Sequence, residues 1–203
     1  MSRKARTPIA VAVTGGIGAG KSEALAAFAR HGAAVVSSDE IVHCLLCEDA
    51  QVREELVEHF GERILDDAGR VSRAAIAEIV FADRAELDWL ERLLHPRVAR
   101  EYLAWREQLG KLPNPPVVCV TEVPLLYEVG GEERFDVVVA ITAPAELRAE
   151  RTSLASDERG RRLIPEEEKV RRADYAYVND GTLDELDAWV ADTLRVLEAR
   201  ARA

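Results

Sequence analysis

The residues with the clearest chemical meaning form a glycine-rich segment near the start of the chain. Its members are Gly15, Gly16, Ile17, Gly18, Ala19, Gly20, Lys21 and Ser22, and they match G-x-x-x-x-G-K-[ST] in full. Glycines allow a loop to approach a polyphosphate closely and to turn its N–H groups inward. The lysine then reaches the terminal phosphates, and the serine hydroxyl binds the Mg²⁺ that bridges them. The segment therefore predicts a site for ATP and Mg²⁺.

The surroundings of this segment agree with that interpretation. The apolar run 9–13 comes directly before it and predicts a strand, while an amphipathic stretch follows it. A helix that begins near Lys21 adds its positive N-terminal end to the site. The alternative is a glycine-rich turn that matches by chance, but the full motif between a strand and a helix favours the nucleotide site.

Length and charge narrow the class of protein further. The chain has 203 residues, 48% of them apolar, which suits one α/β domain. Its formal net charge of −10 offers no basic field for nucleic acid, so a small molecule is the expected partner. No apolar run approaches the length that spans a membrane, and the start of the chain leads directly into a strand. We expect a cytoplasmic monomer or weak homo-oligomer.

Five short apolar runs alternate with helical patterns along the chain. Strands are predicted at 9–13, 33–36, 117–121, 136–141 and 175–178. Such alternation predicts a parallel sheet between helices, in a three-layer α/β/α fold. A capping box at residues 182–185 marks the last helix.

The long helical stretch between the second and third strands is too long for a simple crossover. Ser72 is a plausible cap for a helix at 74–81, and another helical run covers 85–94. We expect a helical insertion at about 41–113, a core formed by 8–40, 114–145 and 172–203, and a basic segment at about 146–171.

Cys44 and Cys47 form the chain's one C-x-x-C pattern. A redox pair or half of a zinc site is conceivable, but no second such pattern exists. Residues 41–46 resemble the apolar face of a short helix, so we expect both cysteines, and His43 beside them, to pack structurally.

Asp39 is the next chemical candidate because it follows the second predicted strand. A carboxylate there lies near the region where an acceptor hydroxyl meets the γ-phosphate, and it can accept the hydroxyl's proton. Asp is also a favoured helix N-cap, and the local sequence leaves the two interpretations open.

Several blocks together resemble the dephospho-CoA kinase family from about residue 9 to the last helix. They are Gly15 to Ser22, Asp39-Glu40-Ile41-Val42-His43, Phe60-Gly61, Gly69-Arg70-Val71-Ser72-Arg73, Leu94-His95-Pro96, Glu122-Val123-Pro124-Leu125-Leu126-Tyr127-Glu128 and Ala173-Asp174-Tyr175. Many families share the first block, so the Leu-His-Pro and Val-Pro-Leu-Leu-Tyr-Glu blocks carry the assignment.

The resemblance implies transfer of the ATP γ-phosphate to the ribose 3′-hydroxyl of dephospho-CoA. Asp39 then corresponds to the family's catalytic carboxylate, and Lys21 neutralises charge that develops in the transfer. Glu122 ends a strand and is a second candidate ligand for Mg²⁺ besides Ser22, although it can also be a cap or a solvated charge.

On the acceptor side, the resemblance implies that Arg73, His95 and Leu125 contact substrate. His95 can instead make a structural hydrogen bond, and the His95-Pro96 pair is typical of a turn between helices. Arg73 can equally pair with an acidic neighbour.

The densest basic run of the chain, at 148–162, resembles a kinase lid, and we expect the lid to cover about 146–171. Family spacing points to Arg151 and then Arg159 as arginines that contact the nucleotide, since a guanidinium clamps phosphate or stacks on adenine. The alternative is an ordinary solvated helix face.

This chain also departs from the family pattern. It has Ser37-Ser38-Asp39 where Asp-Ala-Asp is usual, Glu23 in place of Thr, and Glu122 in place of Asp. Two other classes therefore remain open: a P-loop kinase for another small molecule, and an ATP-binding regulator that has lost catalysis.

Overall fold

A computed structural model of the chain describes residues 7–151 and 163–201. Its strands are β1 (Ile9–Thr14), β2 (Ala34–Ser37), β3 (Val118–Glu122), β4 (Val137–Thr142) and β5 (Tyr175–Val178). Its helices are α1 (Lys21–Arg30), α2 (Ser38–Glu48), α3 (Ala50–Phe60), α4 (Arg73–Ala82), α5 (Arg84–Gly110), α6 (Ala145–Arg151), α7 (Glu166–Arg172) and α8 (Leu183–Arg200), with 3₁₀ turns at Glu62–Ile64 and Glu132–Arg134. Within the described ranges, none of these helices combines the length and the apolar character of a membrane span.

The five strands form one parallel sheet in the order β2-β3-β1-β4-β5. All five strands were predicted, and the observed bounds differ from the predicted ones by at most one residue. Continuous apolar runs are typical of strands that are covered on both faces. The central strand β1 is buried along almost its whole length.

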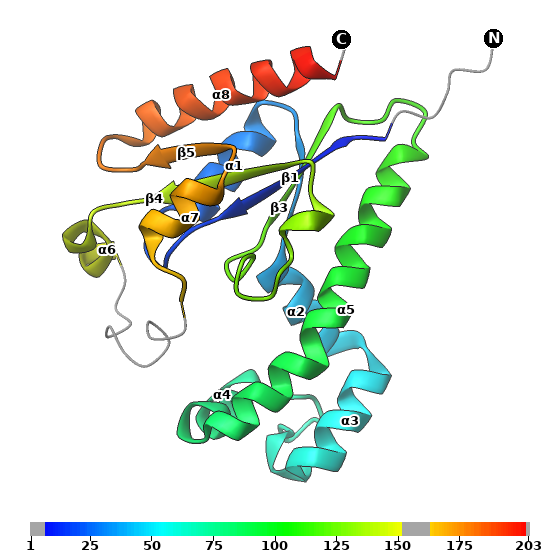
Figure 1. The fold of residues 1–203 in the computed structure, drawn as a ribbon. Helices are drawn as coiled ribbons and strands as arrows, with labels where there is room; N and C mark the ends of the chain where they lie inside the picture. The colour runs from blue at the N-terminus through cyan, green and yellow to red at the C-terminus, as the bar shows by residue number, and fades with distance from the viewer. Residues whose placement is uncertain (1–6, 152–162, 202–203) are drawn as a thin grey trace. The chain divides into compact units, whose positions relative to one another are not determined.

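Helices cover both faces of the sheet (Figure 1). On one face, α1 and α8 pack on a core that includes Val11, Val139, Phe28 and Leu194. On the other, Ala12 and Val138 belong to a second core with residues of the segment after β3, and α7 lies against β4. Alternation along the strands explains this division, because successive side chains point to opposite faces. The predicted α/β/α layering is confirmed.

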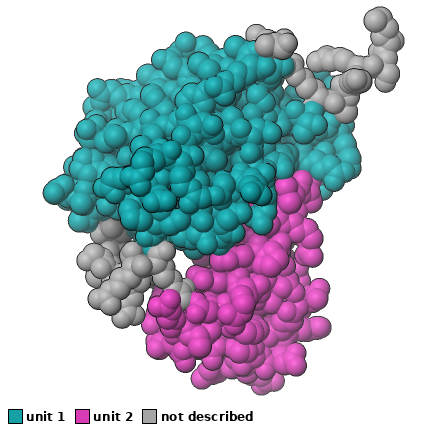
Figure 2. Space-filling view, viewed as in Figure 1, with its two compact units in different colours: residues 1–37, 105–203 teal, residues 38–104 magenta. Residues whose placement is uncertain are grey.

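The chain divides into two compact units, shown in teal and magenta in Figure 2. The first unit comprises residues 1–37 and 105–203 and contains the sheet. The second comprises residues 38–104 and contains α2, α3, α4 and most of α5. Ser72 caps α4 by accepting from the Ala75 N–H, as predicted. In the first unit, Thr182 and Glu185 form the predicted capping box of α8.

The turn predicted at His95-Pro96 is wrong, because α5 continues through Pro96. A proline in a helix interior costs about 3 kcal/mol, since it lacks an N–H and crowds the preceding turn. An apolar stripe offsets this cost by packing on both sides of the proline; it consists of Leu93, Leu94, Val98 and Tyr102, all buried. The Arg97 guanidinium also donates to the Leu93 carbonyl at 2.8 Å.

The interior packing expected for the two neighbouring cysteines is also wrong. Helix α2 buries Ile41, Leu45 and Leu46, but Cys44 and Cys47 lie exposed on its other side, with free thiols. His43 is exposed as well, with its ring 3.7 Å from the Cys47 sulfur. Among the described residues, no group of three or more His, Cys, Asp and Glu side chains is arranged to hold a metal ion.

Candidate functional site

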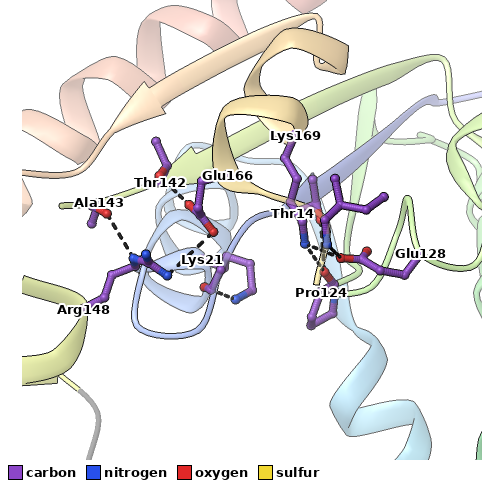
Figure 3. Close-up of polar contacts among 11 residues, drawn as sticks. Thr14, Lys21, Pro124, Glu128, Thr142, Ala143, Arg148, Glu166 and Lys169 are labelled. Atoms are coloured by element: carbon purple, nitrogen blue, oxygen red, sulfur yellow. Dashed lines mark hydrogen bonds and ion pairs between the residues drawn. The ribbon is translucent and has the colours of Figure 1, made fainter. Parts of the chain in front are cut away.

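The glycine-rich loop connects the carboxyl end of β1 to the first turn of α1. The Lys21 side chain is folded back over this loop, and its Nζ donates to the Gly16 carbonyl at 2.9 Å (Figure 3). Gly20 precedes α1 with a φ of 95°, in the left-handed region that favours glycine. The loop therefore brings a lysine and the N-terminus of a helix together, which is the arrangement that binds phosphate.

Ser22 and Glu122 come together beside this loop. The strands β1 and β3 are neighbours in register, with Val13 opposite Glu122. The hydroxyl of Ser22, in the first turn of α1, lies 3.5 Å from Glu122 Oε2. Glu122 is only 5% exposed. A hydroxyl and a carboxylate are the oxygen ligands that Mg²⁺ takes beside nucleotide phosphates, so this pair fits the ion.

Asn179, in the turn after β5, contacts the glycine-rich loop and is only 3% exposed. Its side-chain amide donates to the Ala19 carbonyl at 2.9 Å, and a Cβ on Gly20 would collide with the same amide. Arg151, at the end of α6, donates from Nη1 to the Asn179 carbonyl at 3.1 Å. The structure thus brings Arg151 to the nucleotide loop through one intervening residue. Arg159 lies outside the described residues.

The segment that follows β3 is fixed by a buried ion pair. Lys169 of α7 is 1% exposed, and its Nζ lies 2.8 Å from Glu128 Oε1. The same ammonium donates to the Pro124 carbonyl at 3.4 Å, which also accepts from the Thr14 hydroxyl at 3.3 Å. Figure 3 shows these side chains converging beside the end of β1. The pair therefore ties α7 and the 124–128 segment to the strand that carries the loop.

Leu125 lies in the middle of this fixed segment and is half-buried. Its carbonyl accepts from the Val129 N–H at 3.1 Å, so its backbone belongs to a tight turn.

The remaining candidates lie in the second unit. Asp39 is exposed in the first turn of α2, which begins at Ser38, so Asp39 lies past the N-cap position. Arg73, the first residue of α4, has its Nη1 3.4 Å from Nδ1 of His43. Burial lowers the pKa of the half-buried His95 below its ordinary 6.5, and the charge of Glu91 raises it in part.

Four residues that lie beside the loop were not singled out from the sequence: Asn179, Lys169, Glu128 and Glu166. Arg148 was considered only as the first residue of the basic run 148–162. A usable signal existed for Asn179, because it follows the last strand at the edge where parallel sheets bind ligands. Residues 166–169 have no such signal, since Glu-Glu-Glu-Lys is typical of a solvated helix start. Their roles arise only from the packing of α7.

Comparison with known proteins gives a consistent result along the chain. The family model for dephospho-CoA kinase matches residues 9–185. A dephospho-CoA kinase of Thermobifida fusca is 34% identical over 203 residues, covering 94% of this chain and 96% of the relative. One from Protochlamydia amoebophila is 38% identical over 183 residues, with 87% and 90% covered.

Solved structures agree with these sequences. A crystal structure from Thermus thermophilus superposes with a TM-score of 0.74 at 34% identity, covering 94% of this chain and 98% of the other. A dephospho-CoA kinase from Campylobacter jejuni gives a TM-score of 0.71 at 25% identity, with 94% and 97% covered. Family, sequence relatives and fold thus agree over nearly the whole chain.

Proposed function

Because the chain belongs to the dephospho-CoA kinase family, we propose that it moves the γ-phosphate of ATP to the ribose 3′-hydroxyl of dephospho-CoA. The products are ADP and coenzyme A, so the reaction is the final step of coenzyme A synthesis. The observation that carries this proposal in the structure is the glycine-rich loop itself: Lys21 lies over it, and Ser22 beside Lys21 meets Glu122 at the carboxyl end of β3.

The loop binds the nucleotide phosphates by its backbone N–H groups and by Lys21. The N–H dipoles of the loop and the Lys21 ammonium stabilise the charge that shifts to the leaving oxygen as the phosphoryl group departs. Lys21 Nζ donates to the Gly16 carbonyl, and the flexible stem of the lysine allows the ammonium to turn to the phosphates.

Ser22 and Glu122 would hold Mg²⁺, Ser22 directly and Glu122 through its carboxylate or an intervening water. The ion, if bound there, would neutralise part of the charge of the nucleotide phosphates. Glutamate is one methylene longer than the aspartate usual in this family, and the 3.5 Å separation from Ser22 is compatible with both residues serving one ion.

On the acceptor side, the oxygen of the ribose 3′-hydroxyl bonds to the γ-phosphorus, and Asp39 accepts the proton of that hydroxyl. The bond from that phosphorus to the bridging oxygen breaks in the same displacement, and ADP leaves. Arg73, His95 and Leu125 bind the acceptor, while Arg151 and Arg159 bind the nucleotide. We also propose that the protein is a cytoplasmic monomer or weak homo-oligomer and that it has no nucleic-acid or membrane partner.

The function is tested by an ADP-release assay with Mg·ATP and purified full chain. Dephospho-CoA is compared with adenosine, pantetheine 4′-phosphate and shikimate, and product mass is checked for coenzyme A. We expect turnover that is selective for dephospho-CoA. Turnover with a different acceptor indicates another small-molecule kinase, whereas tight ATP binding without any turnover indicates a diverged regulator.

A further inference from the structure

A polar cluster beside the nucleotide loop has no role in the proposed reaction so far. It joins Glu166 of α7 to Arg148 of α6, with Arg148 Nη1 3.9 Å from Glu166 Oε1. The other carboxylate oxygen accepts from the Thr142 hydroxyl at the end of β4. Arg148 is held from behind, because its Nε donates to the Ala143 carbonyl at 3.1 Å. Figure 3 shows both charged groups pointing toward the loop.

The loop glycines show how closely this pair lies to the phosphate site. A Cβ on Gly16 would collide with Glu166 Oε1 and would lie 3.0 Å from Arg148 Nη1. A Cβ on Gly18 would lie 2.7 Å from the Arg148 carbonyl oxygen. The glycines therefore leave room for Arg148 and Glu166 as well as for a nucleotide, and the ion pair is packed directly on the loop.

A carboxylate at this position opposes the electrostatics of the loop. Lys21 and the N-terminus of α1 both attract negative charge, as phosphate binding requires. The side chains of Glu166 and Arg148 are only 20% and 29% exposed, so water screens them incompletely. Incoming phosphates would repel Glu166 and attract Arg148 by the same interaction.

We propose that Arg148 pairs with Glu166 when no nucleotide is bound, and that it pairs with the phosphates of ATP instead when ATP binds. Arg148 is then a further nucleotide-binding residue. Glu166 is a positioning residue that holds Arg148 ready and lowers the affinity of the empty site. The inference rests on the ATP site proposed above and adds two residues to it.

The test measures nucleotide binding by calorimetry on the full chain, with ATP, ADP and AMP and without acceptor. Glu166→Gln should tighten ATP binding about 3- to 10-fold, as expected when a like charge is removed from a half-buried site. Arg148→Gln should weaken it about 10-fold or more, because a charge-assisted contact is lost. The matched control is Glu167→Gln, which removes the same charge from the next, exposed residue and should change binding less than about twofold.

Two features separate this role from a structural one. The effects of both variants should grow from AMP to ATP and shrink at high salt, because they act on phosphate charge. Arg148→Lys should retain part of the affinity, and thermal unfolding verifies that each variant is folded. If Glu166→Gln and Arg148→Gln both weaken ATP binding, or if AMP responds as strongly as ATP, the inference is overturned while the proposed function stands. A wild-type chain that does not bind ATP overturns both.

Discussion

The proposed nucleotide side, in the unit that contains the sheet, and the proposed acceptor side, in the unit 38–104, are built in different ways. Ser22, in the first turn of α1 beside Lys21, meets Glu122 at the end of β3, and the pairing of β1 with β3 brings the loop and Glu122 together. Asp39 and Arg73 lie at the starts of two separate helices in the other unit, where Arg73 Nη1 lies 3.4 Å from Nδ1 of His43. The first arrangement is fixed by the topology of the sheet, whereas the second depends on how helices pack.

The largest effect should come from breaking the nucleotide side at Lys21. Lys21→Ala removes the charge that stabilises the transferring phosphate, and kcat/KM for ATP should fall about 10³-fold. Steady-state kinetics with ATP binding measured in parallel test this. Lys111→Ala is the matched control, because that lysine has a 69% exposed side chain and should leave activity unchanged. Normal kinetics in Lys21→Ala would contradict the phosphate-binding role of the loop.

Asp39→Asn breaks the acceptor side instead. If Asp39 is the base, phosphoryl transfer should fall by about 10² or more while ATP binding persists, since the nucleotide residues lie elsewhere. Single-turnover transfer and ATP titration separate the two quantities. Glu40→Gln changes the neighbouring exposed acid in the same helical turn and should have little effect. Unchanged transfer in Asp39→Asn rejects the assignment.

The same contrast explains what the sequence could predict. The apolar runs predicted each of the five strands to within one residue. Because parallel sheets bind ligands at the carboxyl ends of their strands, the sequence also indicated that Glu122 lies near the loop, and the structure places it 3.5 Å from Ser22. Lys169 and Glu128 are far apart in the chain, and nothing local distinguishes Lys169 from a solvated lysine. Its burial follows from the packing of α7.

Helix α5 shows the opposite error. The local rule for proline predicted a break at Pro96, but tertiary packing of the stripe from Leu93 to Tyr102 overrides it. Local chemistry therefore predicts the nucleotide loop well, because the motif is continuous in sequence. It predicts the second unit, residues 38–104, less well, because contacts between helices determine where the residues of that unit lie.

The buried ion pair behind the loop should contribute much to the rigidity of the nucleotide side. Lys169→Met leaves Glu128 buried without its ammonium partner, and stability should fall by about 3 kcal/mol. Denaturant unfolding measures this. In the control Lys111→Met, the lost partner is the exposed Glu107, 2.7 Å away, and the change should be below about 0.5 kcal/mol. Equal losses in the two variants would show that the burial of Lys169 carries no special weight.

A smaller change is expected at the metal ligands. Ser22→Ala removes one proposed oxygen ligand while Glu122 remains, so the Mg²⁺ concentration for half-maximal activity should rise about 10-fold. Ser22→Thr retains the hydroxyl and should restore the wild-type requirement. Magnesium titrations at saturating ATP distinguish the two variants. A Ser22→Ala chain with an unaltered magnesium requirement would remove Ser22 from the ion's ligands.

The smallest expected effect concerns the acceptor unit and its half-buried His95. Burial holds the pKa of His95 below 6.5, so the unfolded chain binds a proton that the folded chain resists. The free energy of unfolding should therefore be highest above pH 6.5, where His95 is neutral in both states. It should decrease as the pH falls from 6.5 toward the lower pKa of His95 in the folded chain. Urea unfolding at pH 7.5, 6.5 and 5.5 measures the slope, and His95→Gln should be less sensitive to pH than wild type. The remaining histidines are the same in both chains, so the difference isolates His95. Identical slopes would mean that His95 is no more desolvated in the folded chain than in the unfolded one. Water would then reach α5 at His95, in contrast to Lys169, whose side chain is 1% exposed.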